Sequence, residues 1–125
     1  MLLVSYFHGT YQRLLALESR GIRLGLDRIR DVLAFLKDPQ KSARRTLLVA
    51  GTNGKGSVAA TLSSMSQAAG VKAGLFTSPH LAYPVERYRV GDADMSWDDF
   101  NRVGDRVLAA MDSAQVPLSH FEALT

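Results

Sequence analysis

The chain has 125 residues, enough for one domain or a large part of one. Apolar residues make up 46% of it and charged residues 22%, which is ordinary for a globular protein with a real core. The absence of cysteine excludes disulfides, thiolate metal sites and a cysteine nucleophile. The net charge of +3 is spread along the chain, and no apolar run approaches the ~20 residues that cross a bilayer. We therefore expect a cytoplasmic protein that binds neither nucleic acid nor a membrane.

Two helices are expected near the N-terminus. Thr10–Arg20 is predicted to be a short helix that ends at Gly21. Leu26–Lys37 is a stronger prediction because its apolar residues recur at spacings of three and four. The polar segment 37–42 contains a proline and is predicted to be a loop.

A strand–helix–strand unit is expected in the middle of the chain. Thr46–Ala50 is a continuous apolar run, typical of a parallel strand buried on both faces. A glycine-rich segment follows, then a helix over Ser57–Ala69 and a second strand over Val71–Thr77. A right-handed crossover would leave the two strands parallel, which predicts an α/β domain.

The last third is predicted to contain one long helix. A loop over Thr77–Tyr83 and a short extended piece over Pro84–Val90 come before it. Ser96–Ser113 begins with the pattern of a capping box, and its apolar residues (Trp97, Phe100, Val103, Val107 and Met111) lie on one face. A further element begins within Leu118–Thr125, after Pro117.

The strongest chemical signal is the glycine-rich segment Gly51–Ser57. Glycines let backbone N–H groups approach phosphate oxygens, and a helix N-terminus adds its dipole. Lys55 supplies a mobile charge for the β- and γ-phosphates, and Ser57 offers a hydroxyl to phosphate or Mg²⁺. We expect these two residues to act in catalysis as well as binding. The candidate nucleotide-binding residues are Thr52, Asn53, Gly54, Lys55, Gly56 and Ser57.

The segment departs from the common P-loop pattern. Val49 stands at the position of the first glycine, and Gly56 follows Lys55 where that pattern has serine or threonine. The alternative is a strand–helix turn that binds nothing. Three glycines, a lysine and a serine between a strand and a helix argue against that alternative.

Gly51–Ser57 resembles the ATP loop of the folylpolyglutamate synthases and dihydrofolate synthases, within the Mur ligase superfamily. Other segments resemble this family in the same order and separate its folate members from the Mur peptide ligases. They are Gly21–Ile29, Thr77–Leu81, Glu86–Val90 and Ser119–Glu122. The resemblance implies that residues 1–125 are the N-terminal portion of a P-loop-type, Mur-ligase-like ATP-binding domain, with a parallel sheet and flanking helices.

The resemblance also implies a reaction. ATP, with Mg²⁺, phosphorylates a carboxylate of a folate or dihydropteroate, and L-glutamate attacks the acyl phosphate to form an amide. Such a reaction needs charge neutralisation and alignment more than covalent help from the protein. Dihydrofolate synthase and folylpolyglutamate synthase activities share these motifs, so the choice between them stays open.

Within the loop after the second expected strand, the resemblance makes Ser78 a Mg²⁺ ligand and His80 a substrate-binding residue. The alternative for Ser78 is a turn cap before Pro79, and for His80 a solvated side chain. His8 has no motif around it and is interpreted as structural. In Glu86–Val90, an arginine could lie near the anionic tail of the folate. The alternative there is an exposed strand with salt bridges.

The resemblance implies that the segment Ser119–Glu122 contacts dihydropteroate. Phe121 would stack on the pterin, and Glu122 would accept its hydrogen bonds or bind a water near Mg²⁺. The alternative is a helix start in which Ser119 and Glu122 form a capping box and Phe121 lies in the core, and the two interpretations are compatible. The candidate substrate residues of this segment are Ser119, His120, Phe121 and Glu122.

Members of the family are several hundred residues long, and their further Mg²⁺ ligands, a glutamate and a histidine, lie beyond Thr125. We therefore expect this chain alone to lack ligase activity and to self-associate through exposed sheet edges, and the full-length parent to be a monomer. Two other hypotheses stay open: a nucleotide-binding module without ligase chemistry, and a segment of a Mur-type peptide ligase.

Overall fold

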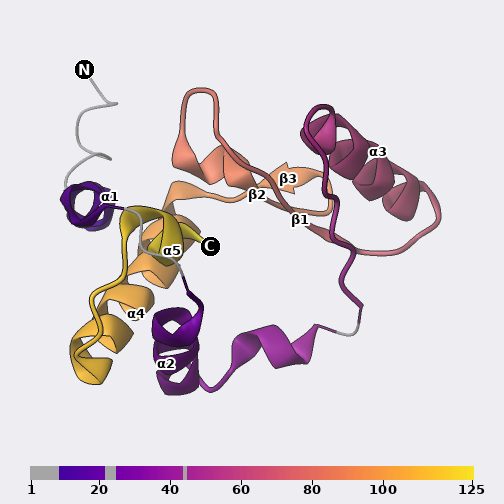
Figure 1. Cartoon of the computed structure of the whole chain (residues 1–125). Coiled ribbons are helices and arrows are strands. Elements are labelled where there is room, and N and C mark those ends of the chain that lie inside the picture. The colour runs from indigo at the N-terminus through magenta and orange to yellow at the C-terminus, as the bar shows by residue number, and fades with distance from the viewer. Residues whose placement is uncertain (1–8, 22–24, 44) are drawn as a thin grey trace. The chain divides into compact units, whose positions relative to one another are not determined.

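The computed structural model describes residues 9–21, 25–43 and 45–125 (Figure 1). His8 and part of the Gly21–Ile29 match lie outside the described residues. The chain forms two compact units. One comprises residues 1–45 and 98–125, and the other is Thr46–Trp97. Each unit is described by itself.

Helices build the first unit. α1 (Thr10–Leu15) continues as the 3-10 helix η2 (Ala16–Arg20) and stops at Gly21, whose φ of 66° suits a glycine. α2 spans Asp27–Phe35, and the segment expected to be a loop contains a short 3-10 turn, η3 (Pro39–Ser42). α4 runs over Trp97–Ala114 and α5 over His120–Leu124. The helices predicted near the N-terminus and in the last third are therefore confirmed, within a few residues at their ends.

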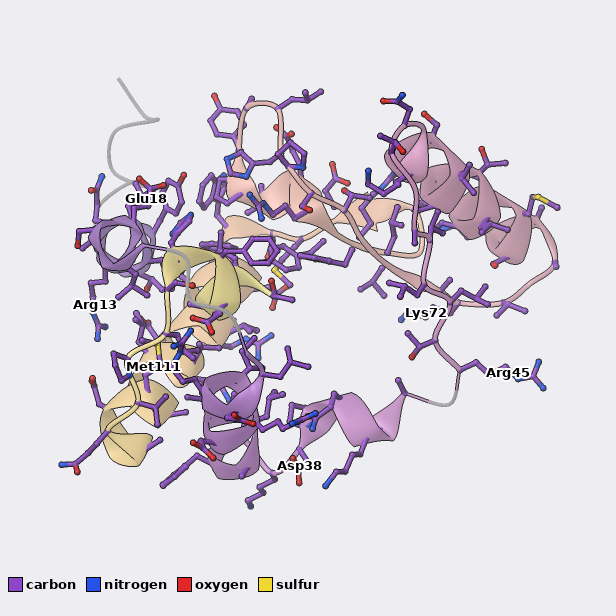
Figure 2. All side chains as sticks on the ribbon, viewed as in Figure 1. Arg13, Glu18, Asp38, Arg45, Lys72 and Met111 are labelled. Carbon is purple, nitrogen blue, oxygen red and sulfur yellow. The ribbon has the colours of Figure 1, made fainter. Side chains whose placement is uncertain are left out.

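The core of this unit is apolar, and α4 supplies much of it. Ser96 stands directly before the first residue of α4, where the predicted cap belongs. The buried face of α4 is centred on Phe100, Gly104, Leu108 and Met111, so it is rotated from the predicted face, and Val103 is 38% exposed. Figure 2 labels Met111 on this helix. Leu14 of α1 and Leu124 of α5 are also buried.

α1 and α4 approach each other closely at Gly104. A Cβ atom at this position would lie 2.6 Å from the Thr10 Cγ2 methyl and 3.4 Å from Leu14 Cδ1. The Thr10 hydroxyl donates a hydrogen bond of 2.7 Å to Asp105 Oδ1, and the Tyr11 and Phe100 rings meet edge to face at 6.1 Å. A glycine is therefore required at position 104 for packing rather than for backbone freedom.

The second unit contains a small antiparallel sheet and one helix. α3 (Lys55–Ala68) leads into β1 (Gly74–Phe76), and η4 (Pro84–Arg87) leads into β2 (Tyr88–Val90), which is followed by β3 (Ala93–Asp94). The strand order is β1-β2-β3, with Leu75 opposite Arg89 and Val90 opposite Ala93. The Phe76 and Tyr88 rings pack across the β1–β2 pair at 5.5 Å.

The predicted parallel pair of strands is not formed among the residues that this structure describes. Thr46–Ala50 has no regular secondary structure, and Leu47 and Leu48 are 78% and 91% exposed. Only Gly74–Phe76 of the second expected strand is a strand, and its partner is the antiparallel β2. A buried parallel strand needs neighbours along its edges and over its faces, and no described residue provides them for Thr46–Ala50.

We expect Gly104→Ala to destabilise the first unit by about 1–3 kcal/mol, because the added methyl overlaps the buried Thr10 side chain. Urea denaturation followed by circular dichroism measures the effect. Thr10→Ser removes the facing methyl and keeps the hydroxyl, so the double variant should recover part of the loss. If the two changes were simply additive, the steric explanation would be wrong.

Candidate nucleotide and substrate site

The predicted phosphate loop lies at the N-terminus of α3. Gly51 and Gly54 both have positive φ, 153° and 74°, and Gly54 is the last residue before the helix. α3 begins at Lys55, two residues earlier than expected, and no side chain caps it. The first N–H groups of a helix have no partner inside the helix, so this end offers amide donors at the positive pole of the dipole. All residues of the loop are exposed.

Lys55 folds back over this loop. Its ammonium donates hydrogen bonds to the carbonyl oxygens of Gly51, at 2.7 Å, and Thr52, at 3.1 Å. These contacts hold a full positive charge beside the uncapped end of α3. The hydrogen bonds from Lys55 to these carbonyl oxygens are exposed to water and therefore weak. The Lys55 ammonium can exchange them for hydrogen bonds to a phosphate without breaking a buried contact.

The loop that carries Ser78 and His80 is tied at both ends. The Thr77 N–H donates to the Arg87 carbonyl at 2.9 Å and closes its base. Ser78 is exposed and precedes Pro79 through a cis peptide bond. At the tip, the Glu86 carboxylate accepts hydrogen bonds from three consecutive backbone N–H groups, those of Leu81, Ala82 and Tyr83, at 2.8–3.3 Å.

These backbone contacts favour the charged carboxylate. The N–H groups of Leu81 and Tyr83, ahead of the opposing effect of burial, hold the pKa of Glu86 below its ordinary value of 4.5. These hydrogen bonds between the Glu86 carboxylate and the loop, here called the Glu86 clamp, are therefore fully formed above pH 4.5. They are lost as the pH falls through the lowered pKa. The Leu81 side chain is 97% exposed, while the N–H groups of Leu81, Ala82 and Tyr83 are already bonded to Glu86.

We predict that Glu86→Gln opens the tip of this loop, because a neutral amide presents one acceptor oxygen where the carboxylate presents two. Amide hydrogen exchange at neutral pH should accelerate at Leu81, Ala82 and Tyr83 and stay unchanged in α3. Asp94→Asn, which removes the charge paired with Arg89, is the matched control. Unchanged protection at the tip in Glu86→Gln would contradict the clamp.

The two arginines of Glu86–Val90 differ in their exposure and in their partners. Arg89 forms a 2.9 Å ion pair with Asp94 across the β2–β3 pair, as the salt-bridged alternative expects. Arg87 is 8% exposed, so the exposed alternative is wrong for it. Its Nε donates to His80 Nδ1 at 2.8 Å. Sequence patterns do not predict this contact, because His80 lies in an irregular loop and Arg87 lies at the end of η4.

The motif Ser119–Glu122 forms the capping box of α5. The Ser119 hydroxyl accepts from the Glu122 N–H at 3.3 Å, and Glu122 Oε2 accepts from the Ser119 N–H at 2.8 Å. Glu122 Oε1 also pairs with Arg28 Nη2 of α2 at 2.7 Å. The His120 ring contacts the Leu14 carbonyl at 2.8 Å, while Phe121 is 54% exposed. The capping box of the alternative is therefore confirmed, whereas its placement of Phe121 in the core is wrong, because Phe121 faces solvent.

Glu122 is buried, and its contacts decide its charge. Burial raises the pKa of Glu122, but hydrogen bonds from Ser119 and Arg28 outweigh it and leave the pKa below 4.5. The carboxylate therefore stabilises the fold above pH 4.5, and the stabilisation is lost as the pH falls through the lowered pKa. Sequence spacing reveals the capping box but not Arg28, which is 94 residues away in the chain.

We predict that Glu122→Gln destabilises the first unit by about 2 kcal/mol, because it removes the charge of the carboxylate and so weakens its hydrogen bonds with Ser119 and Arg28. Urea unfolding at pH 7 and pH 4 checks this prediction. The difference between wild type and variant should be smaller at pH 4, because below pH 4.5 the Glu122 carboxylate of the unfolded chain takes up protons more readily than that of the folded chain. A difference that stays constant with pH would show that Glu122 acts by shape alone.

The candidate residues fall into two groups. Gly51–Ser57, Ser78 and His80 belong to the unit Thr46–Trp97, whereas Ser119–Glu122 belong to the other unit, where Arg28 joins them. Among the residues that the structure describes, no three histidine, aspartate or glutamate side chains gather as a metal site. Within the same residues, no helix combines the length and apolar character needed to span a membrane.

Known proteins resemble the chain closely. No family model matches it. The dihydrofolate synthetase of Saccharomyces cerevisiae is 36% identical over 105 residues, which are 84% of this chain and 24% of the yeast protein. Escherichia coli FolC, solved with DHPP and ADP, has a TM-score of 0.83 and 34% identity over 95% of this chain and 29% of that one. A bifunctional folylpolyglutamate synthase/dihydrofolate synthase, solved with Mn, AMPPNP and L-glutamate bound, has a TM-score of 0.82 and 32% identity. The match covers 94% of this chain and 28% of that chain.

The fold and the site together define a chain of helices with a small antiparallel sheet, in which a glycine-rich loop leads into the N-terminus of α3. With these similarities in sequence and structure, the chain belongs to the folylpolyglutamate synthase and dihydrofolate synthase family. It spans between about a tenth and a quarter of the length of the curated relatives that it matches.

Proposed function

We propose that the chain is the nucleotide-binding part of an ATP-dependent ligase that joins L-glutamate to a folate or dihydropteroate carboxylate through an acyl phosphate. The observation that carries the proposal is the uncapped N-terminus of α3, entered through two glycines with positive φ and accompanied by the Lys55 ammonium. Relatives whose structures hold ADP or AMPPNP support it.

The phosphates of ATP would lie against the amides of Thr52–Ser57. Backbone donors and a helix dipole favour anionic oxygens, and the Lys55 ammonium would leave the loop carbonyls for the β- and γ-phosphates. Phosphoryl transfer gains from such fixed positive charge because the transferred group carries negative charge throughout. The Ser57 hydroxyl is one turn into the helix and can donate to the same oxygens.

Mg²⁺ would be held mainly by the nucleotide. Ser57 and Ser78 offer neutral oxygens, which suit a hard cation when phosphate oxygens and water complete its shell. Because the described residues offer no cluster of three histidine or carboxylate side chains, these two hydroxyls are the proposed contribution of this chain. When bound, the cation would neutralise charge on the transferred phosphoryl group.

The organic substrate would meet the second group of residues. Phe121 is the exposed aromatic of its motif and can stack on a flat pterin ring. Ser119 and Glu122 would act by holding α5, since their polar atoms already bond each other and Arg28. His120 would do the same through the Leu14 carbonyl. His80 would meet an anionic part of the substrate.

The finer architecture is also part of this proposal. We infer that Thr46–Ala50 is the central strand of a P-loop-type, Mur-ligase-like parallel sheet when the neighbouring strands of a longer polypeptide are present. Leu47 and Leu48 support this inference, because two adjacent, almost fully exposed leucines ahead of a phosphate loop are otherwise unfavourable.

Lys55→Ala should weaken MgATP binding about tenfold or more, because one charge-assisted hydrogen bond contributes ~1.5–3 kcal/mol. Isothermal titration calorimetry on the chain measures the change. Lys72→Ala removes the same charge just ahead of β1, where Figure 2 labels this lysine, and should bind as wild type. Equal affinity of Lys55→Ala and wild type would overturn the proposed nucleotide site.

A further inference from the structure

The contact between His80 and Arg87 fixes where the imidazole carries its proton. Arg87 Nε lies 2.8 Å from His80 Nδ1. A guanidinium has only donors, so Nδ1 must be the acceptor and cannot carry a hydrogen. A neutral His80 therefore carries its hydrogen on Nε2.

The other described histidine has the opposite arrangement. His120 Nδ1 lies 2.8 Å from the Leu14 carbonyl oxygen, which can only accept. Nδ1 of His120 therefore carries the hydrogen. The chain thus holds two histidines in opposite tautomers, one in each compact unit.

Burial and backbone hydrogen bonds hold Arg87 in a fixed position beside His80. Its side chain is 8% exposed, on η4 beside the buried Pro84 and Val85. Its own carbonyl accepts the Thr77 N–H, and the adjacent Glu86 clamps the tip of the same loop. Arg87 Nη1 is buried and has no hydrogen-bond partner among the described residues. An arginine kept in place with one donor unsatisfied is poorly explained by stability alone, which favours a positioning role.

We infer that Arg87 is a positioning residue that fixes His80 as the Nε2–H tautomer, and that His80 donates this hydrogen to an anionic oxygen bound beside Ser78. The oxygen belongs to a carboxylate or a phosphoryl group, and this identity rests on the proposed function. Both groups only accept hydrogen bonds, so a ring fixed as a donor matches them. In this tautomer Nε2 cannot take a proton, so the base that deprotonates the attacking amine is another group.

Nitrogen NMR tests the tautomer without any ligand. A long-range ¹H–¹⁵N spectrum of the labelled chain at about pH 8, above the usual histidine pKa of ~6.5, distinguishes the two protonated nitrogens. The chain has three histidines, and the variants His80→Gln and His120→Gln assign two of them. We expect hydrogen on Nε2 in His80 and on Nδ1 in His120. Hydrogen on Nδ1 of His80 would overturn the inference.

Arginine variants test the positioning role. Arg87→Met should convert His80 into a mixture of tautomers and leave His120 unchanged. Arg87→Lys, which can still donate to Nδ1, should keep the wild-type tautomer, and it decides the question if Arg87→Met fails to fold. Arg89→Met is the matched control, because it removes a neighbouring arginine whose partner is Asp94. A pure Nε2–H ring in folded Arg87→Met would overturn the role of Arg87.

Two isosteric variants test the donor. The amide nitrogen of His80→Gln reaches the position of Nε2, whereas that of His80→Asn reaches only Nδ1. We expect His80→Gln to bind within about threefold of wild type and His80→Asn to bind about tenfold more weakly. Calorimetry with MgATP and with dihydropteroate, used separately, distinguishes a phosphoryl oxygen from a carboxylate. If His80→Gln and His80→Asn lost the same affinity for MgATP and the same affinity for dihydropteroate, His80 would not act as the donor. Failure of the nucleotide site itself is reported separately by Lys55→Ala.

Discussion

The proposed function depends on one physical arrangement, the open N-terminus of α3. Helices usually begin with a side chain that accepts from their first amides, and this one begins with Gly54, which has none. An uncapped end in water is slightly unfavourable unless an anion uses it. Lys55 strengthens the argument, because it adds a second positive group to the same loop and donates to two exposed carbonyl oxygens of that loop. Two sources of positive potential, in a segment Gly51–Ser57 that contains no acidic residue, favour a phosphate ligand.

Two glutamates are bound in the same way at different places, and their contacts narrow the list of substrate residues. Glu86 accepts from three backbone N–H groups, and Glu122 accepts from the N–H and hydroxyl of Ser119 and from Arg28. These hydrogen bonds lower the pKa of each carboxyl. A carboxylate whose oxygens are already engaged is a poor candidate for direct substrate contact. Among the motifs that resemble the family, the exposed members Ser78 and Phe121 are better placed for it.

Helices were predictable from the sequence because their signals are local. Gly21 and Gly70, with φ of 66° and 74°, end segments at the expected places, and Ser119 with Glu122 caps α5 as its spacing suggests. Strand pairing depends on partners elsewhere in the chain. The apolar run Thr46–Ala50 has the composition of a buried strand, yet no described residue pairs with it as a strand, so it has no regular secondary structure and Leu47 and Leu48 stay exposed. The same limit applies to Arg28 and Glu122, which only tertiary structure brings together.

The sequence proposes which residues form the site, but it does not give the hydrogen bonds that decide how their side chains act. A motif identifies His80 as a residue of interest, while its hydrogen-bond partner decides whether the ring donates, accepts or takes a proton. Arg87 settles this question with a single contact, since a partner that only donates leaves one tautomer for the neutral ring. The arginine contributes through the histidine it orients, in the way that outer-shell groups orient metal ligands. It follows that replacing Arg87 should change how His80 acts even if every residue that touches the substrate is retained.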